Sequence, residues 1–192
     1  MNAKFSHTQY LVRKKVMTLA GAKFHIYDNN EQLVLFSQMK AFKLKEDIRL
    51  YADESMKEEL ITIQARSVID FSATYDVVDA VTGHPLGSLR RKGMKSILKD
   101  EWVIMSPSER EIGLIKEDSV LMAMLRRFLS NLIPQTFNVE LGGSMVAEFK
   151  QNFNPFVSKL NVDFALDPNQ QLDRRLGLAA AVLLLAIEGK QG

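Results

Sequence analysis

The chain contains no cysteine. This absence excludes disulfide scaffolds, thiolate zinc sites and cysteine nucleophiles. Excess charge of one sign is also lacking, with 25 Lys and Arg against 23 Asp and Glu in 192 residues. A net charge of +2 does not hold a chain to nucleic acid, so no nucleic-acid partner is expected. With 46% hydrophobic and 25% charged residues, the composition predicts one globular domain over 1–192.

No apolar run is long enough to cross a membrane as a helix. The first seven residues lack the apolar core of a secretory signal. The longest apolar run, 176–187, has about 12 residues and is followed by Glu188 and Lys190, whereas a spanning helix needs about 20. We therefore expect a cytoplasmic protein, with peripheral contact to a membrane as an option.

Sequence motifs for catalysis and metal binding are missing. The chain has no G-x-S-x-G elbow, no H-x-x-x-H pair and no phosphate-binding P-loop. Three aspartates, Asp163, Asp167 and Asp173, are spaced too widely for a calcium loop. The three histidines stand in no catalytic arrangement: His7, His25 and His84. We expect no enzymatic activity, no cofactor and no metal.

Most of the chain is predicted to form short strands rich in Val, Ile, Phe and Tyr. Many alternate apolar and polar residues, as Ile61 and Ile63 do with Thr62 and Gln64. Only a few residues join one strand to the next, which favours antiparallel hairpins over βαβ units. The expected strands are 8–14, 23–28, 32–42, 48–51, 60–66, 75–79, 86–92, 101–105, 112–117, 136–141, 145–151 and 159–166.

The C-terminal helix is predicted to be apolar on every face. Asp167 is a plausible N-cap with Pro168 in the first turn, and Asp173 is a rival start. Burial of the seven Leu, Val and Ile side chains in 176–187 is worth about 10–20 kcal/mol as an upper estimate. Such a helix must be surrounded by protein. The predicted fold is mainly β with two helices (α+β), a closed antiparallel barrel of about 12 strands around this buried helix.

A second helix is predicted between the ninth and tenth strands. It begins at Ser119, a plausible N-cap, and ends at Ile133 before Pro134. A leucine and phenylalanine stripe runs along one side of it. Three interpretations are open: a cover across the barrel mouth, a surface for a protein partner, or an interfacial helix that dips into lipid.

This order of elements resembles the tubby C-terminal-like fold and, within it, the LURP-one-related and phospholipid-scramblase-like families. The resemblance implies a barrel around a buried helix and, from members that bind phosphoinositides or act in lipid movement, membrane association. The cysteine-rich segment and proline-rich arm of scramblases are absent here, so lipid scrambling is not implied. The stretches that carry the likeness are Tyr75-Asp-Val-Val-Asp-Ala-Val-Thr-Gly-His-Pro-Leu-Gly-Ser-Leu-Arg-Arg-Lys92, Trp102-Val-Ile, Asp163-Phe-Ala-Leu-Asp167 and Leu172-Asp-Arg-Arg-Leu-Gly-Leu-Ala-Ala-Ala181.

Basic residues cluster most densely at the end of the seventh predicted strand. In a strand, Arg90 and Lys92 share one face and Arg91 takes the other. Such a cluster attracts anionic headgroups by about 1 kcal/mol per basic residue; the alternative is a solvated sheet edge that its charges protect from pairing. The predicted anion-binding set is Arg90, Arg91, Lys92 and Lys95, and a weaker cluster is Arg13, Lys14 and Lys15.

These observations predict a non-enzymatic domain that binds anionic phospholipid, or a partner close to a membrane, through the basic surface at 90–95. The expected partners are an anionic membrane surface and a protein held by the helix over 119–133. Two alternatives remain: an interaction scaffold with no lipid role, and a small-ligand carrier with a polar pocket at the barrel mouth.

Overall fold

The structure of the chain is a computed structural model that describes residues 2–17, 21–39, 47–66, 73–92, 101–118, 135–152 and 157–187. Within these ranges the chain forms a 3-10 helix, strands β1 to β12 and the helix α2. Their bounds are η1 Ala3–Phe5, β1 Gln9–Met17, β2 Gly21–Asp28, β3 Leu33–Met39, β4 Asp47–Tyr51, β5 Glu59–Ala65, β6 Thr74–Asp79, β7 Pro85–Arg91, β8 Glu101–Met105, β9 Glu111–Glu117, β10 Thr136–Leu141, β11 Ser144–Asn152, β12 Ser158–Asp163 and α2 Arg174–Ile187.

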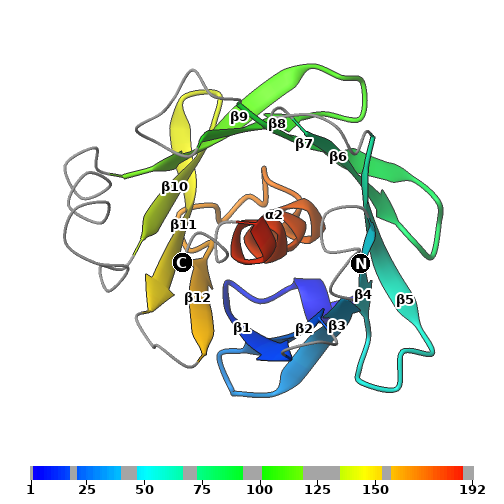
Figure 1. Ribbon diagram of the computed structural model, residues 1–192. Helices are drawn as coiled ribbons and strands as arrows, with labels where there is room; N and C mark the ends of the chain where they lie inside the picture. The colour runs from blue at the N-terminus through cyan, green and yellow to red at the C-terminus, as the bar shows by residue number, and fades with distance from the viewer. Residues whose placement is uncertain are drawn as a thin grey trace.

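The strands close into one antiparallel barrel, as the alternation and the short turns predicted. Each strand pairs with its neighbours in sequence, and β1 pairs with β12 to complete the ring (Figure 1). Closure removes the unpaired edges that an open sheet of this size would carry. All twelve predicted strands are present, but β12 ends at Asp163 instead of 166, because the Asp163 carboxylate accepts the Ala165 amide at 2.7 Å and turns the chain.

Helix α2 lies inside the barrel, surrounded by the strands (Figure 1). All of its residues from Leu176 to Ala186 are buried, which confirms the prediction drawn from its apolar composition. The helix begins at Arg174, so the rival start is correct: Asp173 accepts the Arg175 amide at 2.9 Å. At Gly177 a Cβ atom would come 2.7 Å from the Phe164 ring, so the close contact between α2 and Phe164 requires glycine there.

The base of α2 is held by ion pairs, one of them fully buried. Asp167 is 0% exposed and accepts a hydrogen bond from Arg174 at 2.8 Å, and the Arg174 guanidinium lies over the Phe164 ring. Arg175 pairs with both Asp173 and Asp79. Burial alone raises the pKa of Asp79, but the amides of Thr82 and Val81 and the charge of Arg175 outweigh it, so that the pKa is lowered.

The other end of α2 meets a lysine from the barrel wall. Lys14 is 2% exposed because its side chain points inward, and its ammonium donates to the Leu185 carbonyl at 2.6 Å. A cation at the last turn of a helix is stabilised by the unsatisfied carbonyls there. The weaker basic cluster is therefore divided by strand alternation: Lys14 faces the core, while Arg13 and Lys15 are exposed.

Among the described residues, β3 and β4 share the shortest register in the barrel. It consists of one residue pair, Phe36 with Tyr51, whereas β4 and β5 share five. Lys4, which is not part of the sheet, connects these two strands. Its ammonium donates to Val34 O in β3 and to Ala52 O just after β4, at 3.0 Å each. The N-terminal segment thus holds this seam together.

Two sequence predictions concern residues outside the described ranges. The helix expected from Ser119 to Ile133, with its proposed protein partner, lies outside the described residues, and so does Lys95. Among the helices that the structure does describe, none is long and apolar enough to cross a membrane.

Candidate functional site

The predicted anion-binding residues are separated by the barrel wall. Arg90 pairs with Glu111 on the outer surface, and Lys92 pairs with Glu101 at 2.6 Å. Arg91 lies opposite Trp102, a core residue, so the register places it on the inner face of β7. The structure therefore keeps Arg90 and Lys92 on one face and gives each an acidic neighbour.

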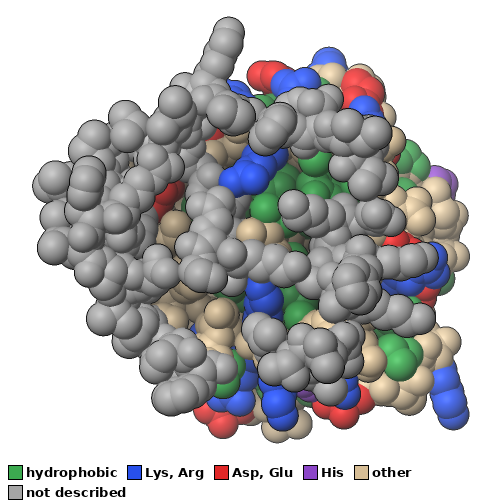
Figure 2. All heavy atoms as spheres, in the orientation of Figure 1, with side chains coloured by type: hydrophobic (Ala, Val, Ile, Leu, Met, Phe, Trp, Pro, Cys, Tyr) green, Lys and Arg blue, Asp and Glu red, His purple; other side chains and the backbone are tan. Residues whose placement is uncertain are grey.

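Ion pairs also neutralise the basic side chains across the outer surface from β5 to β10. Arg66 pairs with Asp76 at 2.6 Å and also with Glu109, whose pKa is lowered by the hydrogen bond from Arg66. Lys116 pairs with Glu140 at 2.9 Å. Figure 2 shows acidic and basic side chains side by side along the upper edge of the molecule, where Figure 1 places β6 to β9. This surface is a ladder of ion pairs.

Basic side chains without such acidic partners gather on the opposite wall, over β12, β1 and β2. Strand alternation turns Arg13 and Lys15 outward, and the register places cations directly beside them: Lys159 next to Arg13, and Lys23 next to Lys15. We call this set the basic face: Arg13, Lys15, Lys23 and Lys159. It unites one residue pair of the weaker sequence cluster with two lysines that are distant in sequence.

Within the described ranges, no carboxylate forms an ion pair with any residue of the basic face. Two of its cations rest on aromatic rings: Arg13 lies 5.2 Å from the Tyr27 centroid and Lys23 lies 5.8 Å from that of Phe36. These contacts orient the cations without cancelling their charge. His25, in the same row as Arg13, forms a hydrogen bond with the Glu54 carboxylate, which accepts from the ring nitrogen at 2.8 Å.

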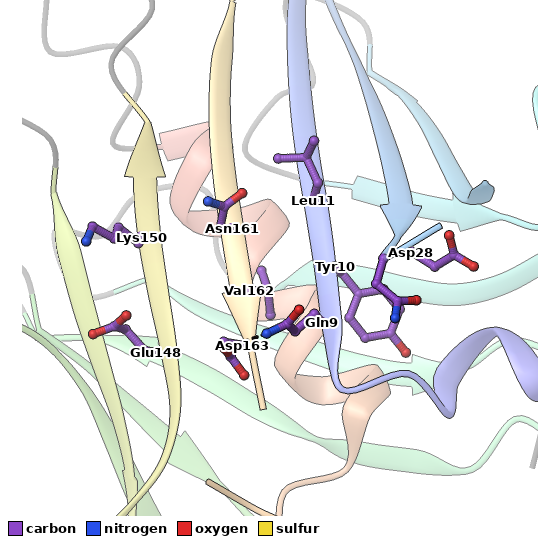
Figure 3. Close-up of a pocket in the computed structure, with 10 residues that line it drawn as sticks. Gln9, Tyr10, Leu11, Asp28, Glu148, Lys150, Asn161, Val162 and Asp163 are labelled. Atoms are coloured by element: carbon purple, nitrogen blue, oxygen red, sulfur yellow. Dashed lines mark hydrogen bonds between the residues drawn. The ribbon is translucent and has the colours of Figure 1, made fainter. Parts of the chain in front are cut away.

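A groove of about 370 Å³ adjoins the basic face on the same wall (Figure 3). It crosses β11, β12, β1 and the end of β2, and we call it the β1–β12 groove. Most of its lining side chains are polar or charged. They are Gln9, Tyr10, Leu11, Asp28, Asn29, Glu148, Lys150, Asn161, Val162 and Asp163.

Charge changes sign along the strands of this wall. In one row of the register, Glu148 lies opposite Asp163, and Asp163 lies opposite Gln9. Two residues further along, Lys150 lies opposite Asn161. The row after that contains Lys159 and Arg13. The groove therefore has an acidic end and leads into a basic one.

Two groups at the edge of the groove are fixed in one protonation state near neutral pH. The Gln32 amide, followed by the Asn30 amide, lowers the pKa of Asp28, outweighing the effect of burial, so its carboxylate stays charged. Burial raises the pKa of Tyr10 to about 12, and its hydroxyl donates to the Lys4 carbonyl at 3.1 Å.

In the part of the chain that the structure describes, no group of three or more His, Asp and Glu residues could hold a metal ion. Asp167 and Asp173 instead accept backbone amides and pair with arginines at the base of α2. These two aspartates therefore serve the helix start, as the sequence suggested.

A closed antiparallel barrel with a buried helix along its axis defines a tubby-like barrel protein. The model of the LURP-one-related family matches residues 33–185, and the chain belongs to this family. In fold it is similar to the X-ray structure of a protein from Arabidopsis thaliana, with a TM-score of 0.53, 14% identity, and 97% of this chain and 96% of that chain covered. The search of curated protein sequences gave no match.

The sequence analysis did not predict the basic face as a whole. Lys23 and Lys159 are isolated in the sequence, and each joins the basic face only because β1 pairs with both β2 and β12. In the sequence, only the spacing of Arg13 and Lys15, which puts them on one face of a strand, pointed to this site. The groove had no signal, because it needs the pairing of the first strand with the last.

Proposed function

We propose that this chain is a non-enzymatic binding module that attaches to anionic phospholipid surfaces through the basic face. The observation that carries the proposal is the set of like charges placed directly opposite one another, Lys15 with Lys23 and Arg13 with Lys159, none of which forms an ion pair with a carboxylate in the described part. Like charges opposite each other in a sheet reduce stability, by a fraction of about 1 kcal/mol per pair. A membrane of anionic lipid removes that repulsion.

The proposal keeps the ligand class expected from sequence and shifts the site. Arg90 and Lys92 can bind a phosphate only after their contacts with Glu111 and Glu101 are broken. Each basic side chain near an anionic surface contributes about 1 kcal/mol, and screening by salt weakens that attraction. The basic face therefore supports binding more directly than the surface at 90–95.

The test is co-sedimentation with vesicles of phosphatidylcholine alone or with phosphatidylglycerol added. We expect binding to the anionic vesicles only, and loss of that binding as salt is raised. Reversing two charges in Arg13→Glu with Lys159→Glu is expected to lower affinity at least tenfold.

The matched control reverses two charges on the other wall, in Arg90→Glu with Lys92→Glu. It produces the same change in net charge, and we expect a clearly smaller loss of affinity. A larger loss for this variant would return the site to the surface predicted from sequence. Equal binding of wild-type protein to neutral and anionic vesicles would overturn the proposal.

Among the hydrogen bonds of the described residues, none joins a serine or threonine hydroxyl to a histidine ring, the contact that activates such a nucleophile. His7 and His25 contact carboxylates instead, Asp28 at 3.8 Å and Glu54 at 2.8 Å.

A further inference from the structure

We propose that the β1–β12 groove recognises a phosphate ester that carries a primary ammonium group, with the ammonium at Glu148 and Asp163 and the phosphate at Lys150 and Asn161. In a membrane this chemistry is the headgroup of an aminophospholipid. The inference rests on the proposed function, because it names the class of lipid that the same wall of the barrel would select.

The acidic end of the groove provides the ammonium contact. Glu148 and Asp163 are directly opposite in the register, which places their Cβ atoms about 4.5–5.5 Å apart. The Asp163 carboxylate accepts from Gln9 at 2.9 Å and from the Ala165 amide at 2.7 Å. Glu148 has no hydrogen-bond or ion-pair partner among the described residues, although it faces another carboxylate. A cation between the two removes their repulsion.

An ammonium group fits this position better than a metal ion. Two carboxylates, one of them already holding two donors, give too few oxygens for calcium. A primary ammonium has three N–H donors and no acceptor. Both Glu148 oxygens and the remaining capacity of Asp163 can accept those donors.

The phosphate contact lies two residues along the same strands. Lys150 and Asn161 are both exposed and directly opposite, and neither side chain has a hydrogen-bond or ion-pair partner among the described residues. Two residues of strand separate Glu148 from Lys150 by about 7 Å. A headgroup whose phosphate and ammonium are joined by two carbons, extended by a hydrogen bond at each end, spans this separation.

The position of the basic face fits this orientation. Lys159 and Arg13 follow Asn161 and Leu11 in the next row, so the positive side of the groove opens toward the cations that attract the membrane. Figure 3 shows Glu148 and Lys150 on β11 facing the same side as Asn161 and Asp163 on β12. A headgroup bound by the basic face therefore places its ammonium over the carboxylates.

The experiment compares vesicles of equal charge that differ in the ammonium. Phosphatidylserine and phosphatidylglycerol each carry one net negative charge, and only the serine headgroup has an ammonium. At equal mole fractions in phosphatidylcholine, we expect roughly tenfold tighter binding to phosphatidylserine, as one charge-assisted contact provides. Glu148→Gln is expected to abolish the preference and to leave phosphatidylglycerol binding unchanged or slightly stronger.

The control is Glu58→Gln, which removes the same charge from an exposed position in the turn between β4 and β5. It is expected to keep the preference. Equal affinity of the wild type for both lipids overturns the inference and leaves the proposed function intact, whereas binding to neither lipid overturns both. A preference that persists in Glu148→Gln overturns the assignment to the groove.

A soluble probe distinguishes a lipid headgroup from a free metabolite of the same chemistry. O-phosphoethanolamine is titrated against isotope-labelled protein, with glycerol 3-phosphate as the control without an ammonium. Shifts of the Lys150 and Asn161 amide signals with the first compound alone support the site. Equal shifts with both compounds overturn the ammonium contact. Saturation at concentrations far below those needed for vesicles overturns the lipid as the ligand.

Discussion

Asp167 shows how much one buried carboxylate can organise at the residue scale. It accepts the amides of Gln171 and Leu172 and binds Arg174, which in turn donates to the Asp167 carbonyl at 2.6 Å. The guanidinium is 2% exposed. Because neither charge reaches water, each depends on the other for solvation, and the first turn of α2 depends on both.

We expect Asp167→Ala to destabilise the protein by about 3–5 kcal/mol, because it leaves the Arg174 guanidinium buried without its counter-ion. Urea unfolding followed by circular dichroism measures the loss. The comparison is Asp173→Ala, which removes the N-cap of the same helix and is expected to cost about 1–2 kcal/mol. Similar losses for the two variants would contradict the role assigned to the buried pair.

Some residue roles were readable beforehand and others were not. A glycine inside a strand is typical of close backbone approach, and at Gly87 a Cβ would meet Met105 O at 2.4 Å. The burial of Lys14 could not be predicted, because a lysine between two other basic residues is expected to lie in water. Its burial follows from the position of the Leu185 carbonyl, which only the docked helix supplies.

At the scale of elements, the seam between β3 and β4 has the shortest register among the described strands. A single described residue pair joins the two strands, and the ammonium of Lys4 supplies two further contacts across the seam. Phe5, next in sequence, is buried in the core. The short N-terminal helix η1 therefore acts as a clamp on the seam.

Lys4→Met keeps the apolar stem and removes the ammonium, which leaves the Val34 and Ala52 carbonyls without this donor. We expect a loss of about 1–3 kcal/mol in the free energy of unfolding. Hydrogen exchange is expected to become faster in β3 and β4 before it does in β8 and β9.

The control is Lys57→Met, an exposed lysine in the turn that follows β4. It is expected to leave both stability and exchange unchanged. Uniformly faster exchange throughout the Lys4→Met barrel would show that the lysine stabilises the molecule as a whole and has no particular role at the seam.

At the scale of the whole molecule, the barrel and the helix share one core. The inner residues of the strands and the apolar residues of α2 form a single buried cluster. Neither part can bury its apolar surface alone, because the helix is apolar on every face and it fills the centre of the barrel. Folding of the two parts should therefore be one cooperative event.

This predicts coincident unfolding transitions for the strands, followed by far-ultraviolet circular dichroism, and for the core, followed by Trp102 fluorescence. A chain that ends at Asp173, and so lacks α2, is expected to lose the cooperative transition entirely. A truncated chain that still unfolds cooperatively would show that the barrel can collapse on its own.

The sequence by itself determined the fold class. Alternation of apolar and polar residues predicted the strands, and an all-apolar helix too short to cross a bilayer required walls on every side. These are local or compositional properties, so they can be read along the chain. The predicted strand ends agree with the structure to within a few residues. At β12 the strand ends early because the Asp163 side chain accepts the Ala165 amide and forms a turn.

Only the tertiary structure decided where charge is left uncompensated. Arg90 and Lys92 read as a free cluster until their neighbours across the sheet, Glu111 and Glu101, are known. Lys23 lies beside Lys15 because β1 pairs with β2, and Lys159 lies beside Arg13 because closure of the barrel pairs the first strand with the last. The electrostatic effect of a charge depends on distances in space, and strand pairing fixes those distances between residues that are far apart in sequence.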